Sequence, residues 1–287
     1  MMKKFLALML ALVMTLSLAA CGSTASSAAS SEAASSETAS SDAASSEAAS
    51  SEAASETETA ELSTVEPGKL IMSTNAAFPP YEMTTDSGEF EGIDIETAQA
   101  IAEKLGLELQ IDDMDFDAAL LSVQQGKADI VMAGVTVTDE RKAVMDFSDS
   151  YATGIQSIIV PEGSDIASVD DLAGKKIGTQ RGTTGYLYCS DDFGEDAVVA
   201  YDNGLTAVQA LNNGQVDAVV IDNEPAKAYV ESNPGLKILD TSYAEEDYAI
   251  GMNKSNTALL EAVNAALEEL KADGTLQSIV DKYITAE

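Results

Sequence analysis

The chain has 287 residues, enough for one two-lobed domain or two small domains. It carries 15 Lys and Arg against 49 Asp and Glu, a net charge of −34. So negative a protein repels phosphate backbones, which argues against nucleic acid as a partner. The chain has no His, which excludes His-based catalytic triads, proton shuttles and His-ligated metal sites.

The N-terminus has the pattern of a secretory signal, with Lys3-Lys4 followed by an apolar run over residues 5–18. The run ends in Leu18-Ala19-Ala20-Cys21, which resembles the lipobox of bacterial lipoproteins, where cleavage precedes the cysteine and its thiol is acylated. We expect a signal peptide over residues 1–20 and a stable anchor in the lipid bilayer through two or more acyl chains on Cys21. An ordinary signal peptide, or a short membrane helix with an incidental cysteine, is the alternative.

Lipidation of Cys21 would leave the second cysteine, Cys189, without a disulfide partner. We therefore expect Cys189 to be a small buried or half-buried residue.

From residue 22 to about residue 66 the chain is nearly all Ser, Ala, Thr and Glu. Acids recur there every five residues, at Glu32, Glu37, Asp42, Glu47 and Glu52. A period of five matches neither a helical face nor a strand, and little is apolar enough to bury. Residues 21–66 are therefore expected to be a lipidated cysteine and a disordered tether, with an average reach of about 35–40 Å. A partly helical or glycosylated tether remains open.

After residue 67 strand-like and helical patterns alternate. Strands are expected over residues 70–73, 107–112 and 130–133, with helices over residues 95–105 and 118–125 between them. Asp94 is the expected cap of the first helix, and Gly106 and Gly126 follow the two helices. Alternation of this kind predicts βαβ units and an α/β fold with mostly parallel sheets.

An internal similarity organises the remaining chain. Residues 121–134 are echoed by residues 209–222, with Gly126 aligned with Gly214 and Asp129 with Asp217. We therefore expect two similar lobes, each a mostly parallel sheet flanked by helices, with a cleft between them. Ligands in such sheets bind beyond the carboxyl ends of the strands. Those ends should face one another, and they are Asn75, Gly134, Gln180 and Asp222.

The chain has two arginines, Arg141 and Arg181, and both are expected in loops just after strands. The planar guanidinium suits a carboxylate, because it donates two parallel hydrogen bonds. Asp222 is the complementary charge at the equivalent position of the other lobe. The alternatives are that Arg141 pairs with a surface acid and that Asp222 caps the helix expected over residues 224–232.

Two further features lie near strand ends. Gly182-Thr183-Thr184 is expected to open a helix, where backbone amides can hold an anion. Phe78 and Phe116 are expected in loops after strands, where they can contact a ligand, although core packing is the usual environment of Phe.

Several segments, in this order, resemble the solute-binding proteins of polar amino-acid ABC importers, family 3, which have the type II periplasmic-binding-protein fold. The resemblance covers residues 70–283. The segments are Phe78-Pro79-Pro80-Tyr81, Gly92-Ile93-Asp94-Ile95, Asp115-Phe116-Asp117, Gly134-Val135-Thr136-Val137-Thr138-Asp139-Glu140-Arg141 and Asp146-Phe147-Ser148.

The resemblance implies a monomer that carries a free amino acid to an ABC permease and needs no cofactor or metal. It implies that Arg141 and the amides of Thr136 and Thr184 bind the α-carboxylate. The α-ammonium would be bound by Asp222 and the Gly134 carbonyl. The ligand side chain would lie between Phe78 and Phe116.

The resemblance also implies two crossover strands, near residues 155–160 and 246–252. Lobe one would then be residues 67–156 plus 247–287, and lobe two residues 157–246. Asn75 stands where binders of basic amino acids often have Asp, and Ala133 replaces a common Ser. These departures favour a neutral ligand such as glutamine or cystine.

Three other interpretations differ in the kind of site they require. The Asp113-x-Asp115-x-Asp117 pattern imitates a calcium loop, but Ala118 and Gln124 replace the Gly and Glu that the loop needs. A dehydratase or lyase on the same fold would need an acid near Asp222, and Glu224 is the nearest candidate. A sensor domain acting through a partner receptor is the third.

Overall fold

The computed structural model describes residues 62–240 and 242–284, all within one compact unit, Thr57–Glu287. The predicted signal peptide, Cys21 and most of the predicted tether lie outside the described residues. Among the helices that are described, none is long and apolar enough to cross a membrane.

The first lobe is built on a five-stranded sheet in the order β5-β1-β6-β14-β7. β1 is parallel to both β5 and β6, whereas β14 runs antiparallel to β6 and β7. The strands are β1 (Lys69–Thr74), β5 (Glu108–Asp113), β6 (Ile130–Val131), β7 (Asp146–Phe147) and β14 (Gly251–Met252), with a small separate sheet of β2 (Ala77–Phe78), β3 (Glu82–Thr84) and β4 (Phe90–Glu91). The helices are α1 (Ile93–Leu105), α2 (Phe116–Gln124), α3 (Asp139–Val144), α7 (Thr257–Ala272) and α8 (Thr275–Tyr283).

The second lobe is built on a six-stranded sheet in which β10-β9-β11-β8-β12 are neighbours and β13 also pairs with β8. Its strands are β8 (Ala152–Pro161), β9 (Ile177–Gln180), β10 (Val198–Tyr201), β11 (Ala218–Asp222), β12 (Leu236–Ile238) and β13 (Ala244–Tyr248). Its helices are η1 (Val169–Leu172), α4 (Thr184–Phe193), η2 (Glu195–Ala197), α5 (Gly204–Asn212) and α6 (Asn223–Ser232). α4 and α5 pack against β9 and β11, and α6 packs against β8.

The two lobes share one topology, as the internal similarity predicts. β1 lies between β5 and β6 just as β9 lies between β10 and β11, and an antiparallel strand follows in each sheet. The aligned aspartates also have the same role. Asp129 accepts the amide of Ile71 at 2.8 Å, and Asp217 accepts the amide of Lys176 at 2.7 Å. The predicted α/β fold with two similar lobes is confirmed.

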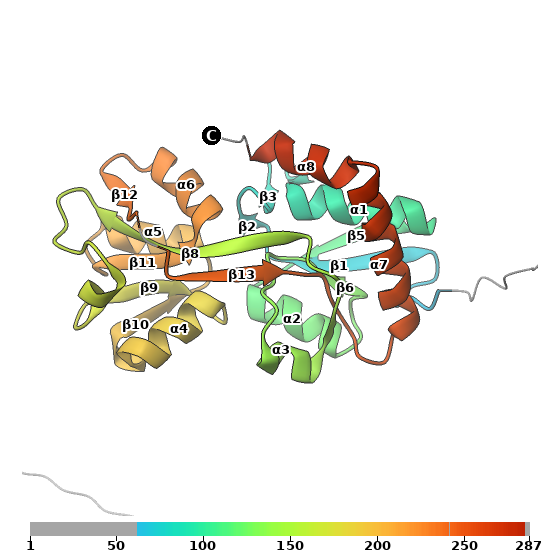
Figure 1. Ribbon diagram of the computed structural model, residues 1–287, viewed down its shortest axis with the longest axis horizontal. Helices are drawn as coiled ribbons and strands as arrows, with labels where there is room; N and C mark the ends of the chain where they lie inside the picture. Colours follow the sequence, from blue (N-terminus) through green and yellow to red (C-terminus); the bar gives the residue numbers. More distant parts are fainter. Residues whose placement is uncertain (1–61, 241, 285–287) are drawn as a thin grey trace, which may run out of the picture. The chain divides into compact units, whose positions relative to one another are not determined.

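Two long strands connect the lobes. β8 and β13 are antiparallel neighbours, with Ala152 opposite Tyr248 and Gln156 opposite Ala244. Figure 1 shows them side by side, extending from the second sheet toward the first. They overlap the segments expected to cross between lobes, while the residue at which each lobe ends stays a prediction.

The prediction that Asp94 caps the first helix is wrong. The N-cap of α1 is Gly92, with φ 132°, and a Cβ there would lie 2.2 Å from the Tyr81 carbonyl oxygen. Asp94 lies in the first turn and is fully buried.

The expected loop positions are also corrected, because Arg141 lies in α3, Phe78 ends β2 and Phe116 begins α2. Cys189 is buried in α4, as predicted.

Candidate ligand-binding site

One cavity gathers side chains from the strand ends of both lobes. All eight predicted ligand-binding residues line it: Asn75, Phe78, Phe116, Gly134, Thr136, Arg141, Thr184 and Asp222. Its remaining lining residues are Glu82, Ala133, Gln180 and Thr183. The four strand ends that the sequence predicts to face one another therefore do meet.

Arg141 is a buried cation, only 8% exposed. Its backbone amide bonds the side chain of Thr138, the N-cap of α3, which fixes the short helix. The guanidinium donates from Nη1 to the Thr136 carbonyl at 2.8 Å and from Nη2 to the Gly182 carbonyl at 3.1 Å. No carboxylate of the described residues lies within ion-pair distance of Arg141, so pairing with a surface acid is not its role. Its charge is available to an anion in the cavity.

Asp222 supplies a buried negative charge at the end of β11. It occupies the N-cap position of α6 but makes no capping hydrogen bond with its side chain, so the helix-cap alternative is not realised. Its carboxylate accepts from Gln156 Nε2 at 2.8 Å and from the Tyr248 hydroxyl. Burial raises the pKa of Asp222 to about 6, because the ionised form is desolvated there. A cation in the cavity would favour the charged form.

The predicted backbone ligands lie close together. Gly134 has φ 54°, and a Cβ there would lie 2.8 Å from the Phe78 ring, so glycine permits this close approach. The hydroxyls of Thr136 and Thr184 are 3.5 Å apart, although they come from different lobes. Thr184 is the first residue of α4, where backbone amides have no partner within the helix and can face an anion.

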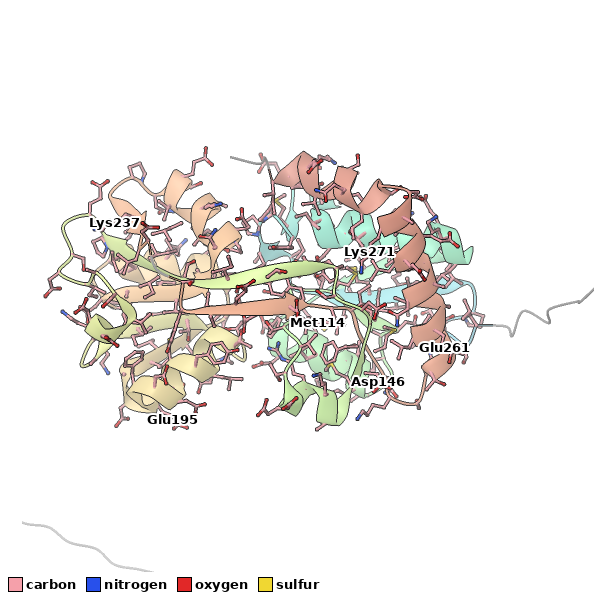
Figure 2. The ribbon with its side chains drawn as sticks, in the orientation of Figure 1. Met114, Asp146, Glu195, Lys237, Glu261 and Lys271 are labelled. Atoms are coloured by element: carbon pink, nitrogen blue, oxygen red, sulfur yellow. The ribbon has the colours of Figure 1, made fainter. Side chains whose placement is uncertain are left out.

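The two aromatic residues and Asn75 are already in contact with protein groups. Phe78 stacks on Tyr81 with ring centroids 5.9 Å apart, and the Arg141 guanidinium lies 5.3 Å from the centre of the Phe116 ring. Asn75 donates to the carbonyl of Met114 at 2.8 Å and accepts from Gln180 Nε2 at 2.9 Å. Met114 is labelled near the middle of Figure 2. Asn75 therefore has little freedom to respond to the charge of a ligand.

Two buried carboxylates near the cavity were not predicted. Glu246, on β13, accepts from Thr184 at 3.0 Å, from Gln156 Nε2 at 3.0 Å and from the Tyr188 hydroxyl at 2.8 Å. Glu246 therefore fixes the side chain of Thr184 and the side-chain amide of Gln156, which also bonds Asp222. Only one signal was available for Glu246, its place in a segment expected to connect the lobes.

Glu82 is the second unpredicted carboxylate, and it lines the cavity directly. It is fully buried on β3, and neither of its oxygens has a hydrogen-bond donor among the described residues. Its position immediately after the Phe78-Pro79-Pro80-Tyr81 segment was a signal that sequence reasoning passed over.

Direct hydrogen bonds also join the lobes. Besides the Arg141 bond to Gly182 and the Gln180 bond to Asn75, the Tyr229 hydroxyl donates to the Ala77 carbonyl at 2.7 Å. The first two of these bonds involve residues that line the cavity, namely Arg141, Gln180 and Asn75.

Comparisons with known proteins agree with this arrangement of two α/β lobes around a buried polar cavity. The chain belongs to the bacterial extracellular solute-binding proteins, family 3, whose model matches residues 70–286. It is 33% identical over 226 residues to the L-cystine-binding protein TcyJ of Escherichia coli, covering 77% of this chain and 85% of that protein.

Solved structures give the same assignment. The glutamine-bound structure of an ancestral arginine-binding protein is 44% identical, with 76% of this chain and 99% of that chain covered and a TM-score of 0.73. ArtJ of Geobacillus stearothermophilus, an arginine-, lysine-, histidine-binding protein, is 33% identical, with 76% and 96% covered and a TM-score of 0.73.

Proposed function

We propose that the protein binds a free amino acid outside the cytoplasmic membrane and delivers it to the permease of an ABC importer. One observation carries this proposal: Arg141, a buried cation that makes no ion pair with any described residue, lines the same cavity as the buried carboxylate of Asp222. The α-carboxylate binds Arg141 and the amides of Thr136 and Thr184. The α-ammonium binds Asp222 and the Gly134 carbonyl.

The ligand side chain lies between Phe78 and Phe116 and points to Glu82. Unpaired carboxyl oxygens in a buried cavity favour a ligand that ends in N–H donors. Glutamine, within the sequence prediction, meets this requirement. Arginine meets it too. Asn75, whose presence in place of an Asp favours a neutral ligand, is bonded to protein groups and therefore does not decide against arginine.

The anchor, the tether and the lobe boundaries belong to the same proposal. The protein is a monomeric lipoprotein held at the extracytoplasmic face of the membrane by Cys21, and residues 21–66 separate the anchor from the binding domain. Lobe one comprises residues 67–156 plus 247–287, and lobe two residues 157–246. Such a tether lets the domain reach a permease in the same membrane.

Binding without turnover is proposed, in agreement with the relatives, whose names describe binding proteins. Glu224, the acid that an enzyme on this fold would use, is not among the residues that line the cavity. Its carboxylate instead accepts from Lys227 at 3.0 Å.

A thermal-shift screen of the purified domain, from residue 62 on, against the common amino acids tests the function. A ligand at about 100 times its Kd stabilises the folded state by about 2.7 kcal/mol, which gives a clear rise in Tm. Calorimetry should then give one site per chain, and the recovered amino acid should be unchanged. Absence of a shift with every amino acid, or chemical conversion of the one that binds, would contradict the proposal.

A further inference from the structure

Glu82 is the feature of the cavity that the clamp on the amino and carboxyl groups does not use. A buried carboxylate normally has a cation or several donors beside it, because desolvation of a charge is costly. Glu82 has neither, since both oxygens lack a donor and no ion pair of the described residues includes it. As an anion, it would be unsatisfied.

Asp94 lies beside Glu82: its backbone amide donates at 2.8 Å to the carbonyl of Tyr81, the residue before Glu82, and each of the two carboxyl groups influences the pKa of the other. Burial raises the pKa of Asp94 to about 6, while the bonds that its carboxylate accepts from the Gly134 amide at 3.0 Å and the Tyr151 hydroxyl at 2.7 Å partly offset this rise. A proton on Glu82 can therefore be donated to Asp94. Such a bond gives Glu82 a partner without a ligand.

The titratable groups of the described residues that surround Glu82 include no cation. They are Tyr81, Asp94 on α1, Asp113 on β5 and Tyr151 from the first lobe side, and Asp222 on β11 and Tyr229 on α6 from the second lobe. All are acids or phenols, so none supplies a positive charge, and the carboxylates of Asp94, Asp113 and Asp222 disfavour an anion at Glu82. Burial and these neighbours raise the pKa of Glu82 well above its usual range.

We propose that Glu82 and Asp94 share one proton in the ligand-free protein and that this acid pair sets the side-chain specificity of the site. A neutral side chain, such as the amide of glutamine, binds with the proton in place. A cationic side chain, such as the guanidinium of arginine, binds only as the proton leaves to solvent. This inference rests on the proposed function, because it concerns the same cavity.

The test compares L-arginine with L-glutamine by calorimetry between pH 6.5 and 8.5, in pairs of buffers with different ionisation enthalpies. Arginine binding should release about one proton, and its Kd should tighten by up to about tenfold per pH unit, whereas glutamine should show neither effect. The ratio of the two affinities cancels any contribution from Asp222, which both ligands contact.

Variants and a spectrum separate the acid pair from a general effect of charge. Glu82→Gln should lose both the proton release and the pH dependence of arginine binding, while Glu91→Gln, at an exposed position of neighbouring β4, should behave as wild type. The infrared spectrum of the ligand-free wild type at pH 7 should contain a protonated-carboxyl band that Glu82→Gln lacks. This measurement requires no ligand.

Equal pH dependence for both amino acids, arginine binding without proton release, or absence of the infrared band would overturn the proposal. Glutamine binding with no arginine binding at any pH would overturn it too, while leaving the proposed function intact. Failure of every amino acid to bind would instead refute the proposed function, and this inference with it.

Discussion

Arg141→Lys is the substitution that most directly tests the clamp. Two of the five N–H donors of Arg141 are committed to the carbonyls of Thr136 and Gly182, and the other three remain for a carboxylate. Lysine keeps the charge, but its compact ammonium cannot bond both carbonyls and still grip a carboxylate with a planar pair of donors. We therefore expect folding to survive and binding to weaken.

The magnitude follows from burial. Arg141 is 8% exposed, so a ligand carboxylate there has lost its water and depends on the protein for replacement bonds. Loss of one partner of a buried charge pair costs about 2–5 kcal/mol, which is roughly 30- to several-thousand-fold in Kd. Arg141→Lys retains the charge and should lie near the lower bound, while Asp222→Asn removes a charge and should lie higher.

The chain offers a matched control in its other arginine. Arg181 is exposed and lies 3.7 Å from Asp202, outside the cavity, so Arg181→Lys should bind like wild type. The assay is calorimetric titration with the amino acid found by screening, together with a Tm for each variant. If Arg141→Lys and Asp222→Asn both bind within about threefold of wild type while folded, the clamp is not at these residues.

Three further predictions follow from charge and chain organisation. Affinity for glutamine should be constant above pH 6.5 and fall by up to about tenfold per pH unit below pH 6. The reason is that the Asp222 carboxyl, whose pKa is about 6 without ligand, must lose its proton to pair with an ammonium. Calorimetry over pH 4.5–8 checks this, and a flat profile would count against Asp222. Cys21→Ser should move the protein from the membrane fraction to the soluble fraction, and retention in the membrane would count against the anchor. Deletion of residues 25–60 should leave Kd and Tm unchanged in calorimetry and thermal unfolding, and a large loss of either would contradict the tether.

The sequence predicted the architecture well because its signals are local and repeated. The stretch with Gly126 and Asp129 recurs with Gly214 and Asp217, and each copy forms a helix, a turn and a buried strand with the same neighbours in its sheet. A repeated Asp accepts a backbone amide in β1 in one lobe and the amide of the residue just before β9 in the other. The eight predicted site residues meet in one cavity because strand ends, glycines and rare arginines mark such positions.

The acidic interior could not be predicted in the same way. Glu82, Asp94 and Glu246 are charged residues in an acid-rich sequence, and such residues are almost always exposed. Their burial depends on partners distant in the sequence, such as Gln156, which bonds Glu246 from 90 residues away. Local patterns contain no record of such contacts, so Asp94 resembled a helix cap.

Charge balance in the cavity connects ligand binding with closure. Asp222 and Thr184 belong to the second lobe, whereas Gly134 belongs to the first, and Arg141 already bonds the Gly182 carbonyl across the cavity. Burial opposes the ionised forms of Asp222 and of Glu82 in the first lobe. In the proposed clamp, a ligand ammonium between Asp222 and the Gly134 carbonyl would favour the ionised form of Asp222, and a ligand carboxylate would pair with Arg141. The proposal therefore predicts that an amino acid with both charged ends stabilises this arrangement of the lobes more than a ligand that lacks either end.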